Sequence, residues 1–150
     1  MAQDLKLTAT TSGLFDLSID ATTKKYEVVE GFETAITVSL MTDARAPSSR
    51  VPQAGDRRGY IGDILTADID RSLGSTLWTF DQSRLTQNII NQIRVSAEQA
   101  FTWMVDQGII LGVTATVTEV ARGLNIAIEL RRLDNTVERY ERLWRLTNAA

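Results

Sequence analysis

The chain has 150 residues, of which 16 are basic and 19 acidic, and it contains neither cysteine nor histidine. This composition excludes disulfides, thiolate metal sites and nucleophiles activated by histidine. The net charge of −3 argues against binding to nucleic acid or to an anionic membrane. No apolar run approaches the ~20 residues of a membrane span, and the first residues lack a signal-peptide pattern, so we expect synthesis in the cytoplasm.

Residues 1–27 predict short strands. Apolar residues alternate with polar ones in two runs that are separated by a turn at Gly13, and residues 21–25 read as a second turn. The alternating apolar positions are Leu5, Leu7, Ala9, Phe15, Leu17 and Ile19.

A small helix is predicted next. Its apolar side follows helical spacing from Phe32 to Leu40, and Glu30 and Glu33 lie near its positive end.

The periodicity stops over residues 42–77, where both prolines, Pro47 and Pro52, and several glycines and charges occur. An irregular stretch of this length inside a compact domain is usually functional or held by a partner, so we expect an interaction loop here. The alternative is a mobile surface loop without a partner.

The stretch from Asp81 to Val120 predicts a long helix followed by a strand. Asp81 or Ser83 can cap the helix start, and Gly108 can end it. Strand 110–120 alternates valine and alanine with threonine, the pattern of a half-buried strand. The helical apolar stripe consists of Leu85, Ile89, Ile93, Ala97, Ala100, Phe101 and Met104.

Two more strands are predicted, over Leu124–Arg132 and roughly Val137–Leu146, with turns near Gly123 and at Asp134-Asn135. The inner face of the last strand stays open, because Tyr140, Trp144 and Leu146 compete with Val137 and Leu143. The expected fold is α+β: a short and a long helix packed on a mainly antiparallel sheet that ends in a β-hairpin or meander, in a single domain over 1–150.

No group of side chains predicts catalysis or metal binding. A glycosidase needs two carboxylates about 5–10 Å apart, whereas Glu98 and Asp106 differ by about 80° in helical direction at ~100° per residue. The segment from Arg57 to Asp63 has glycines and arginines but lacks the lysine and hydroxyl of a P-loop. Asp68 and Asp70 are explained by turns. We therefore assign no catalytic residue, no cofactor and no metal site.

Within the same segment, two glycines flank Tyr60 and Ile61 and allow sharp turns. This spacing predicts that both apolar side chains enter a pocket. Asp63 is then expected to pair with Arg58 or to cap the turn that follows.

Three runs in fixed order, Ser39 to Ala46, Arg58 to Asp63 and Gly74 to Trp78, resemble a known family. They are similar to the Mu-type phage tail proteins of the baseplate wedge, which are related to baseplate assembly protein W and to the wedge protein of type VI secretion systems. The resemblance covers about residues 28–146. The chain departs from the family pattern where Ile61 follows Tyr60 in place of a second aromatic residue.

The resemblance implies a structural subunit of a contractile tail, present in several copies around the tail axis of the virion. Its implied partners are larger wedge proteins and the tail sheath protein, with hub or tube proteins as further candidates. The carboxy-terminal β segment of relatives resembles the strand-sharing part of the sheath subunit. Segments Ile110–Val120 and Leu124–Arg132 are expected to present a sheet edge to it.

We expect the partner contacts in the loop and at two tryptophans, and the alternative for each of them is packing within the chain. These interface residues are Arg57, Arg58, Tyr60, Ile61, Asp63, Trp78 and Trp144.

Two other functions are open at this point. Some relatives are described as lysozyme-like, which would make the chain a peptidoglycan-cleaving enzyme that clears cell-wall suspensions. A freestanding adaptor of an unrelated system would be distinguished by its genomic neighbours.

Overall fold

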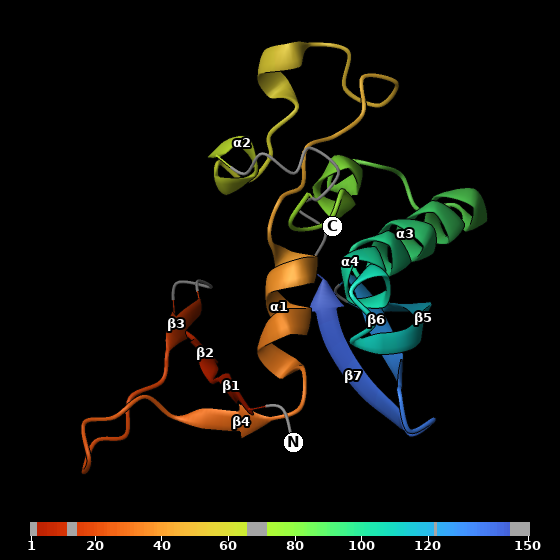
Figure 1. Ribbon diagram of the computed structural model, residues 1–150. Helices are drawn as coiled ribbons and strands as arrows, with labels where there is room; N and C mark the ends of the chain where they lie inside the picture. The colour runs from red at the N-terminus through yellow and green to blue at the C-terminus, as the bar shows by residue number, and fades with distance from the viewer. Residues whose placement is uncertain (1–2, 12–14, 66–71, 122, 145–150) are drawn as a thin grey trace. The chain divides into compact units, whose positions relative to one another are not determined.

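The computed structural model describes residues 3–11, 15–65, 72–121 and 123–144 (Figure 1). Contacts divide the chain into two compact units, Met1–Val38 and Ser39–Ala150. Helix α1 (Glu33–Met41) begins in the first unit and ends in the second, and it confirms the helix predicted there. Whether the chain acts as a single domain stays a prediction.

The first unit contains four strands, β1 (Gln3–Leu5), β2 (Leu7–Ala9), β3 (Phe15–Leu17) and β4 (Val28–Glu30). Strand β1 pairs with β4, and β2 pairs with β3, both antiparallel. The two predicted alternating runs therefore form strands, while β4 was not predicted. The predicted turn at Gly13 lies outside the described residues.

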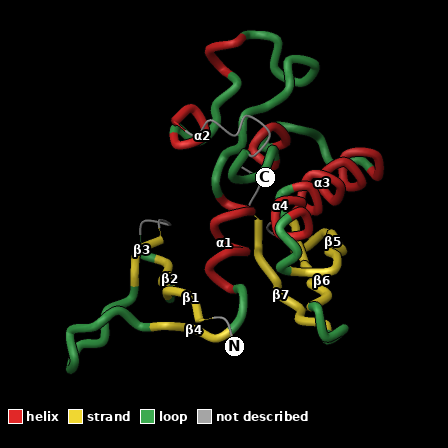
Figure 2. Tube along the Cα trace, viewed as in Figure 1, coloured by secondary structure: helices red, strands yellow, loops and turns green. Residues whose placement is uncertain are grey.

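The second unit holds the remaining elements (Figure 2). Its helical segments are η1 (Ala54–Asp56) and η2 (Leu77–Phe80), both 3₁₀, and the α-helices α2 (Gly62–Leu65), α3 (Gln87–Gln99) and α4 (Thr102–Asp106). Its strands are β5 (Ile110–Val120), β6 (Gly123–Arg132) and β7 (Val137–Trp144). These three form an antiparallel meander in the order β5-β6-β7, which confirms the predicted α+β fold.

The predicted long helix is two helices. Its cap is Thr86, whose hydroxyl accepts a hydrogen bond from the Ile89 amide, so the prediction of Asp81 or Ser83 was wrong. At Ala100 and Phe101 the chain leaves the helical path, and Phe101 is fully buried. The bend keeps both α3 and α4 in contact with β5.

The end of α4 follows the prediction. Gly108 has a positive φ of 66°, and its amide and that of Ile109 donate to the carbonyls of Val105 and Met104. A left-handed glycine closing the last helical turn in this way is the expected use of that residue.

The meander buries one face. Strand β6 supplies four buried residues, and β5 presents Ala115 to the same face. Tyr140 lies opposite Ile128, so the inner face of β7 carries Tyr140 and Trp144. Val137 and Leu143 are exposed, which settles the register; Leu146 lies outside the described residues. The four β6 residues buried on this face are Leu124, Ile126, Ile128 and Leu130.

Candidate functional site

The loop predicted over residues 42–77 is held together at its base. The amides of Ala44 and Ser75 donate to the carbonyls of Ser75 and Thr42, both at 2.9 Å. Gly74 has a φ of 104°, and a Cβ on it would lie 2.3 Å from the Thr42 carbonyl oxygen. Only glycine fits here. The buried Ser75 hydroxyl donates to the Leu40 carbonyl at 2.7 Å, which fixes the base to the end of α1.

Arg57 and Arg58 connect distant parts of the loop through hydrogen bonds and an ion pair. The Arg57 carbonyl accepts from the Ala46 amide at 2.9 Å, and its Nε donates to the Ala46 carbonyl. Arg58 has a φ of 47°, and its Nη1 lies 2.7 Å from Asp43 Oδ2. Both arginines therefore have partners inside the chain, while the Arg58 side chain remains about half exposed.

Trp78 anchors the same region. Its Nε1 donates to the Ala44 carbonyl at 2.9 Å, and the Arg58 guanidinium lies 4.5 Å above its ring. A cation over an indole face is attracted by the ring quadrupole, typically by about 0.5–2 kcal/mol. Trp78 thus holds Arg58 in a fixed place at the surface.

A second cation and ring were not predicted. The Arg50 guanidinium lies 4.3 Å above the Phe80 ring, and its Nη2 donates to Gln92 Oε1 at 3.2 Å. Arg50, Arg58 and Trp78 line an open pocket of about 540 Å³ between the loop and α3. Burial raises the pKa of Asp81 in its wall. No local pattern signals this pocket, because its lining comes from distant parts of the sequence.

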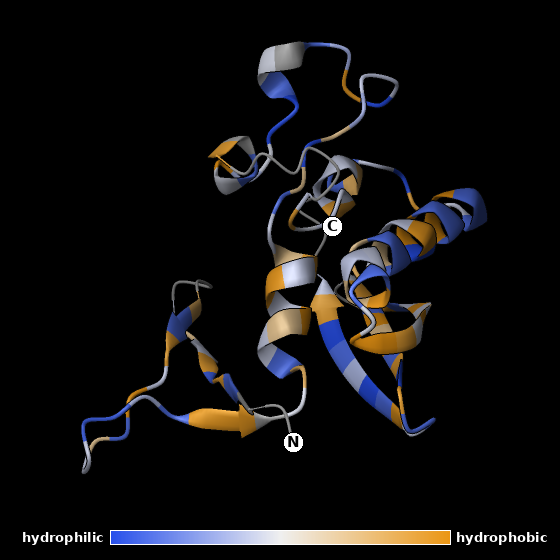
Figure 3. Ribbon diagram, in the orientation of Figure 1, coloured by the Kyte–Doolittle hydropathy of each residue, from blue (hydrophilic) through white to orange (hydrophobic). Residues whose placement is uncertain are grey.

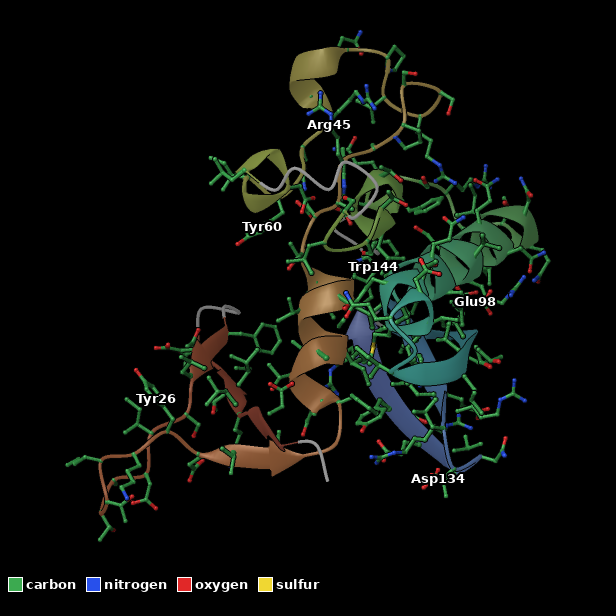
Figure 4. The ribbon with its side chains drawn as sticks, viewed as in Figure 1. Tyr26, Arg45, Tyr60, Glu98, Asp134 and Trp144 are labelled. Atoms are coloured by element: carbon green, nitrogen blue, oxygen red, sulfur yellow. The ribbon has the colours of Figure 1, made fainter. Side chains whose placement is uncertain are left out.

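Beyond this pocket, three apolar side chains stand at the surface. Tyr60 is 46% exposed, Ile61 73% and Leu65 84%. Figure 4 shows Tyr60 extending away from the ribbon. The expectation that Tyr60 and Ile61 enter a pocket of this chain was wrong, because the glycine turns carry them outward.

Asp63 does not pair with Arg58 as one alternative expected. It accepts hydrogen bonds from the Ser72 hydroxyl at 3.1 Å and from the Leu73 amide at 3.2 Å. It therefore connects α2 to the segment at Ser72 and Leu73, and Arg58 pairs with Asp43 instead.

The outer edge of β5 is covered at its centre by Glu98 of α3. Glu98 Oε1 accepts from the Ala115 backbone amide at 3.0 Å and lies 2.9 Å from Arg94 Nη1 (Figure 4). The Ala115 amide must therefore point away from β6. This carboxylate has a structural role, because it accepts a hydrogen bond from a backbone amide at the edge of β5.

The same argument identifies the backbone groups on the outer edge of β7. Ala115 lies opposite Ile128, and Ile128 lies opposite Tyr140. Because backbone groups alternate sides along a strand, Ile128 and Tyr140 bond to each other and Arg139 and Glu141 point outward. The Glu141 carbonyl accepts from Arg142 Nη1 at 3.0 Å, as an outward carbonyl can.

Strand β6 is the central strand, so the expectation that Leu124–Arg132 presents an edge was wrong. Within the described part of the meander, β5 and β7 form the two edges. Figure 3 shows β7 as a largely hydrophilic strand.

In the described ranges, no group of three or more acidic side chains is placed to hold a metal ion. None of the helices seen in those ranges is long and apolar enough to cross a bilayer.

Comparison with known proteins shows the class of protein to which the chain belongs. The chain belongs to a family of phage proteins, described as phage protein GP46, whose sequence model matches residues 32–137. It is 32% identical over 115 residues to the baseplate protein gp46 of Escherichia phage Mu, covering 75% of this chain and 77% of that protein. It is 32% identical over 75 residues to the Mu-like prophage FluMu protein gp46 of Haemophilus influenzae, covering 50% of this chain and 48% of that protein.

Proposed function

We propose that this chain is a structural subunit of the baseplate wedge of a contractile phage tail. The similarity to the baseplate protein of phage Mu extends over 75% of the chain, and the family match includes the loop, α3, β5 and β6 and ends at the first residue of β7. In this role several copies surround the tail axis, and the chain is a component of the virion. It acts by binding, without turnover.

The loop surface is the proposed contact with larger wedge proteins. Tyr60 and Ile61 are held outward beside Arg58, which is itself fixed by Asp43 and Trp78. Exposed aromatic and arginine side chains on a rigid support are the groups that dominate protein interfaces. Asp63 and Arg57 position this surface through their contacts inside the loop. Trp144, half-buried on the inner face of β7, supports the nearby edge.

The edge of β7 is the proposed starting point for the sheath. An added strand from a sheath subunit would hydrogen bond to the outward backbone groups of Val137, Arg139, Glu141 and Leu143. The observation that carries this proposal is the asymmetry of the meander: Glu98 occupies the β5 edge at Ala115, whereas no strand of the described residues pairs with the outer side of β7. Strand addition is therefore directed to one side.

Co-expression with the wedge and sheath proteins encoded beside this chain tests both contacts. The wild type should co-purify with the wedge proteins and recruit sheath subunits. Arg139→Pro removes one outward amide without removing a bond to β6, so it should keep wedge binding and lose sheath recruitment.

Arg139→Ala is the matched control, because it removes the same side chain, with its ion pairs to Glu129 and Glu141, but keeps the amide. It should behave like the wild type in both steps. A chain that stays alone in the presence of the wedge proteins contradicts the wedge role, and equal sheath recruitment by both variants contradicts strand addition at β7.

A further inference from the structure

Residues 3–11 and 15–30 form what we call the three-arm junction. Three backbone hydrogen bonds close a ring at its centre: Lys6 N–H to the Glu27 carbonyl at 3.0 Å, Glu27 N–H to Ser18 at 2.9 Å, and Ser18 N–H to Lys6 at 2.9 Å. From this ring the pair β1–β4, the pair β2–β3 and a third hairpin with its turn at residues 20–25 diverge (Figure 1).

One face of the junction is polar. Glu27 Oε2 lies 2.9 Å from Lys6 Nζ and accepts from the Ser18 hydroxyl at 2.6 Å. The side chains of the three ring residues therefore lie on the same side and bond to one another.

The opposite face is apolar. Side chains alternate along extended chains, so the neighbours of the three ring residues point the other way. Those neighbours face one another across the strands as Leu5 with Val28, Leu7 with Leu17 and Ile19 with Tyr26. All of them except Leu7 are exposed, and Tyr26 is exposed by 58%. The apolar face consists of Leu5, Leu7, Phe15, Leu17, Ile19, Tyr26 and Val28.

The proposed wedge role does not use this face. The family match begins at residue 32, after the junction has ended. Short two-stranded pairs such as these are marginal by themselves, and exposed apolar side chains gathered on one face, unlike single scattered ones, mark an interaction site. The face therefore needs an occupant.

We propose that the apolar face docks on the wedge protein already bound by residues 39–150, at an apolar surface of that protein rimmed by lysine and arginine. The proposal rests on the wedge function given above. Residues 1–38 carry six acidic and three basic side chains, so their net charge of −3 equals that of the whole chain. Two copies of this unit would repel each other, whereas a basic rim would attract it.

The size of the face also disfavours a second copy. A stable freestanding interface buries about 800 Å² on each partner and uses about 20–30 residues a side, whereas the apolar face has seven side chains. A partner already held by residues 39–150 does not need that area, because the tether raises the local concentration of the junction. The junction thus makes a second contact with the assembled wedge, and we call this contact the clamp.

Lysine cross-linking tests the clamp directly, because the three lysines of the chain, Lys6, Lys24 and Lys25, all lie in the junction. The full chain is assembled with its co-expressed wedge proteins, treated with an amine-reactive cross-linker and analysed by mass spectrometry. We expect links from Lys24 or Lys25, in the turn next to Tyr26, to lysines of one wedge protein.

Ile19→Ser/Tyr26→Ser removes one apolar pair of the face, and Thr8→Ala/Thr22→Ala is the control with two exposed polar positions changed. The first double variant should lose the cross-links and weaken binding of the wedge partner by about tenfold or more, while the control should change neither. Val28→Ser, on a different arm, repeats the test if the first variant fails to fold by circular dichroism.

The outcomes separate the two proposals. Co-purification without lysine cross-links, or with affinity that neither apolar variant changes, overturns the clamp and leaves the wedge role intact. A purified chain that dimerises through this face also overturns it. If the chain does not co-purify with any wedge protein, the wedge role itself fails.

Discussion

At the scale of single residues, Glu27 holds the three-arm junction through one carboxylate oxygen. The hydrogen bond from the Ser18 hydroxyl, and next the hydrogen bond and charge of Lys6, lower the pKa of Glu27 from its ordinary value of 4.5. A carboxyl whose pKa is lowered by folding binds fewer protons in the folded state. It therefore stabilises the junction above pH 4.5, and this stabilisation is lost as the pH falls through the lowered pKa.

Glu27→Gln should remove this pH dependence. In the wild type, the protection factors of the Lys6 and Glu27 amides, corrected for intrinsic exchange, should fall as the pH drops below 4.5. In the variant the residue 27 side chain is neutral throughout, so protection should be lower at neutral pH and should fall less than in the wild type as the pH drops. Hydrogen exchange followed by NMR measures both, and parallel curves for the two proteins would contradict the role of Glu27.

At the scale of elements, the contact between α3 and β5 depends on Glu98. Ala115 is almost fully buried, and its amide has Glu98 as its partner on the side away from β6. Removing an acceptor from a buried amide costs more than the bond itself contributes, because the amide keeps its desolvation penalty.

Glu98→Ala should therefore lower the free energy of unfolding by about 1–3 kcal/mol. Urea denaturation measures this change, and Glu98→Gln, which keeps an acceptor oxygen, should cost less than half as much. Arg94→Ala separates the effect of the ion pair, which is partly exposed and should contribute at most about 1 kcal/mol. Equal losses for Glu98→Ala and Arg94→Ala would show that the β5 amide is not the important contact.

The local periodicity of apolar residues predicted the helices and strands in which that periodicity is clear. The alternation in 110–120 and 124–132 is set by one buried face, and β5 and β6 follow it almost to the residue. The short strand β4 has three residues and depends on β1, which is distant in sequence, so no local period reveals it. The break at Phe101 arises from packing on β5, and the apolar stripe runs through it unchanged.

The candidate site was predictable only as a segment. Composition identified residues 42–77, because prolines and glycines interrupt the periodicity there. The contacts that shape the site join distant positions, such as Arg50 with Phe80 and Arg58 with Trp78. The choice of β7 as the open edge depends on which amide Glu98 occupies, and that is a property of the folded chain.

At the scale of the whole molecule, each unit exposes surfaces of the kind that bind other proteins. Residues 39–150 carry no net charge, expose apolar side chains on the loop, and have no described strand paired with the outer side of β7. Residues 1–38 hold all of the net charge and an exposed apolar face. We interpret the chain as a connector whose folded state is completed by its neighbours in the baseplate.

Hydrogen exchange across β7 tests this interpretation most directly. The chain is bound to its wedge proteins and measured with and without the sheath protein. We predict that the sheath slows exchange at the outward amides of Val137, Arg139, Glu141 and Leu143, while the Tyr140 amide, bonded to β6, is slow in both states. Unchanged exchange at the four outward amides while sheath protein is bound would contradict the account.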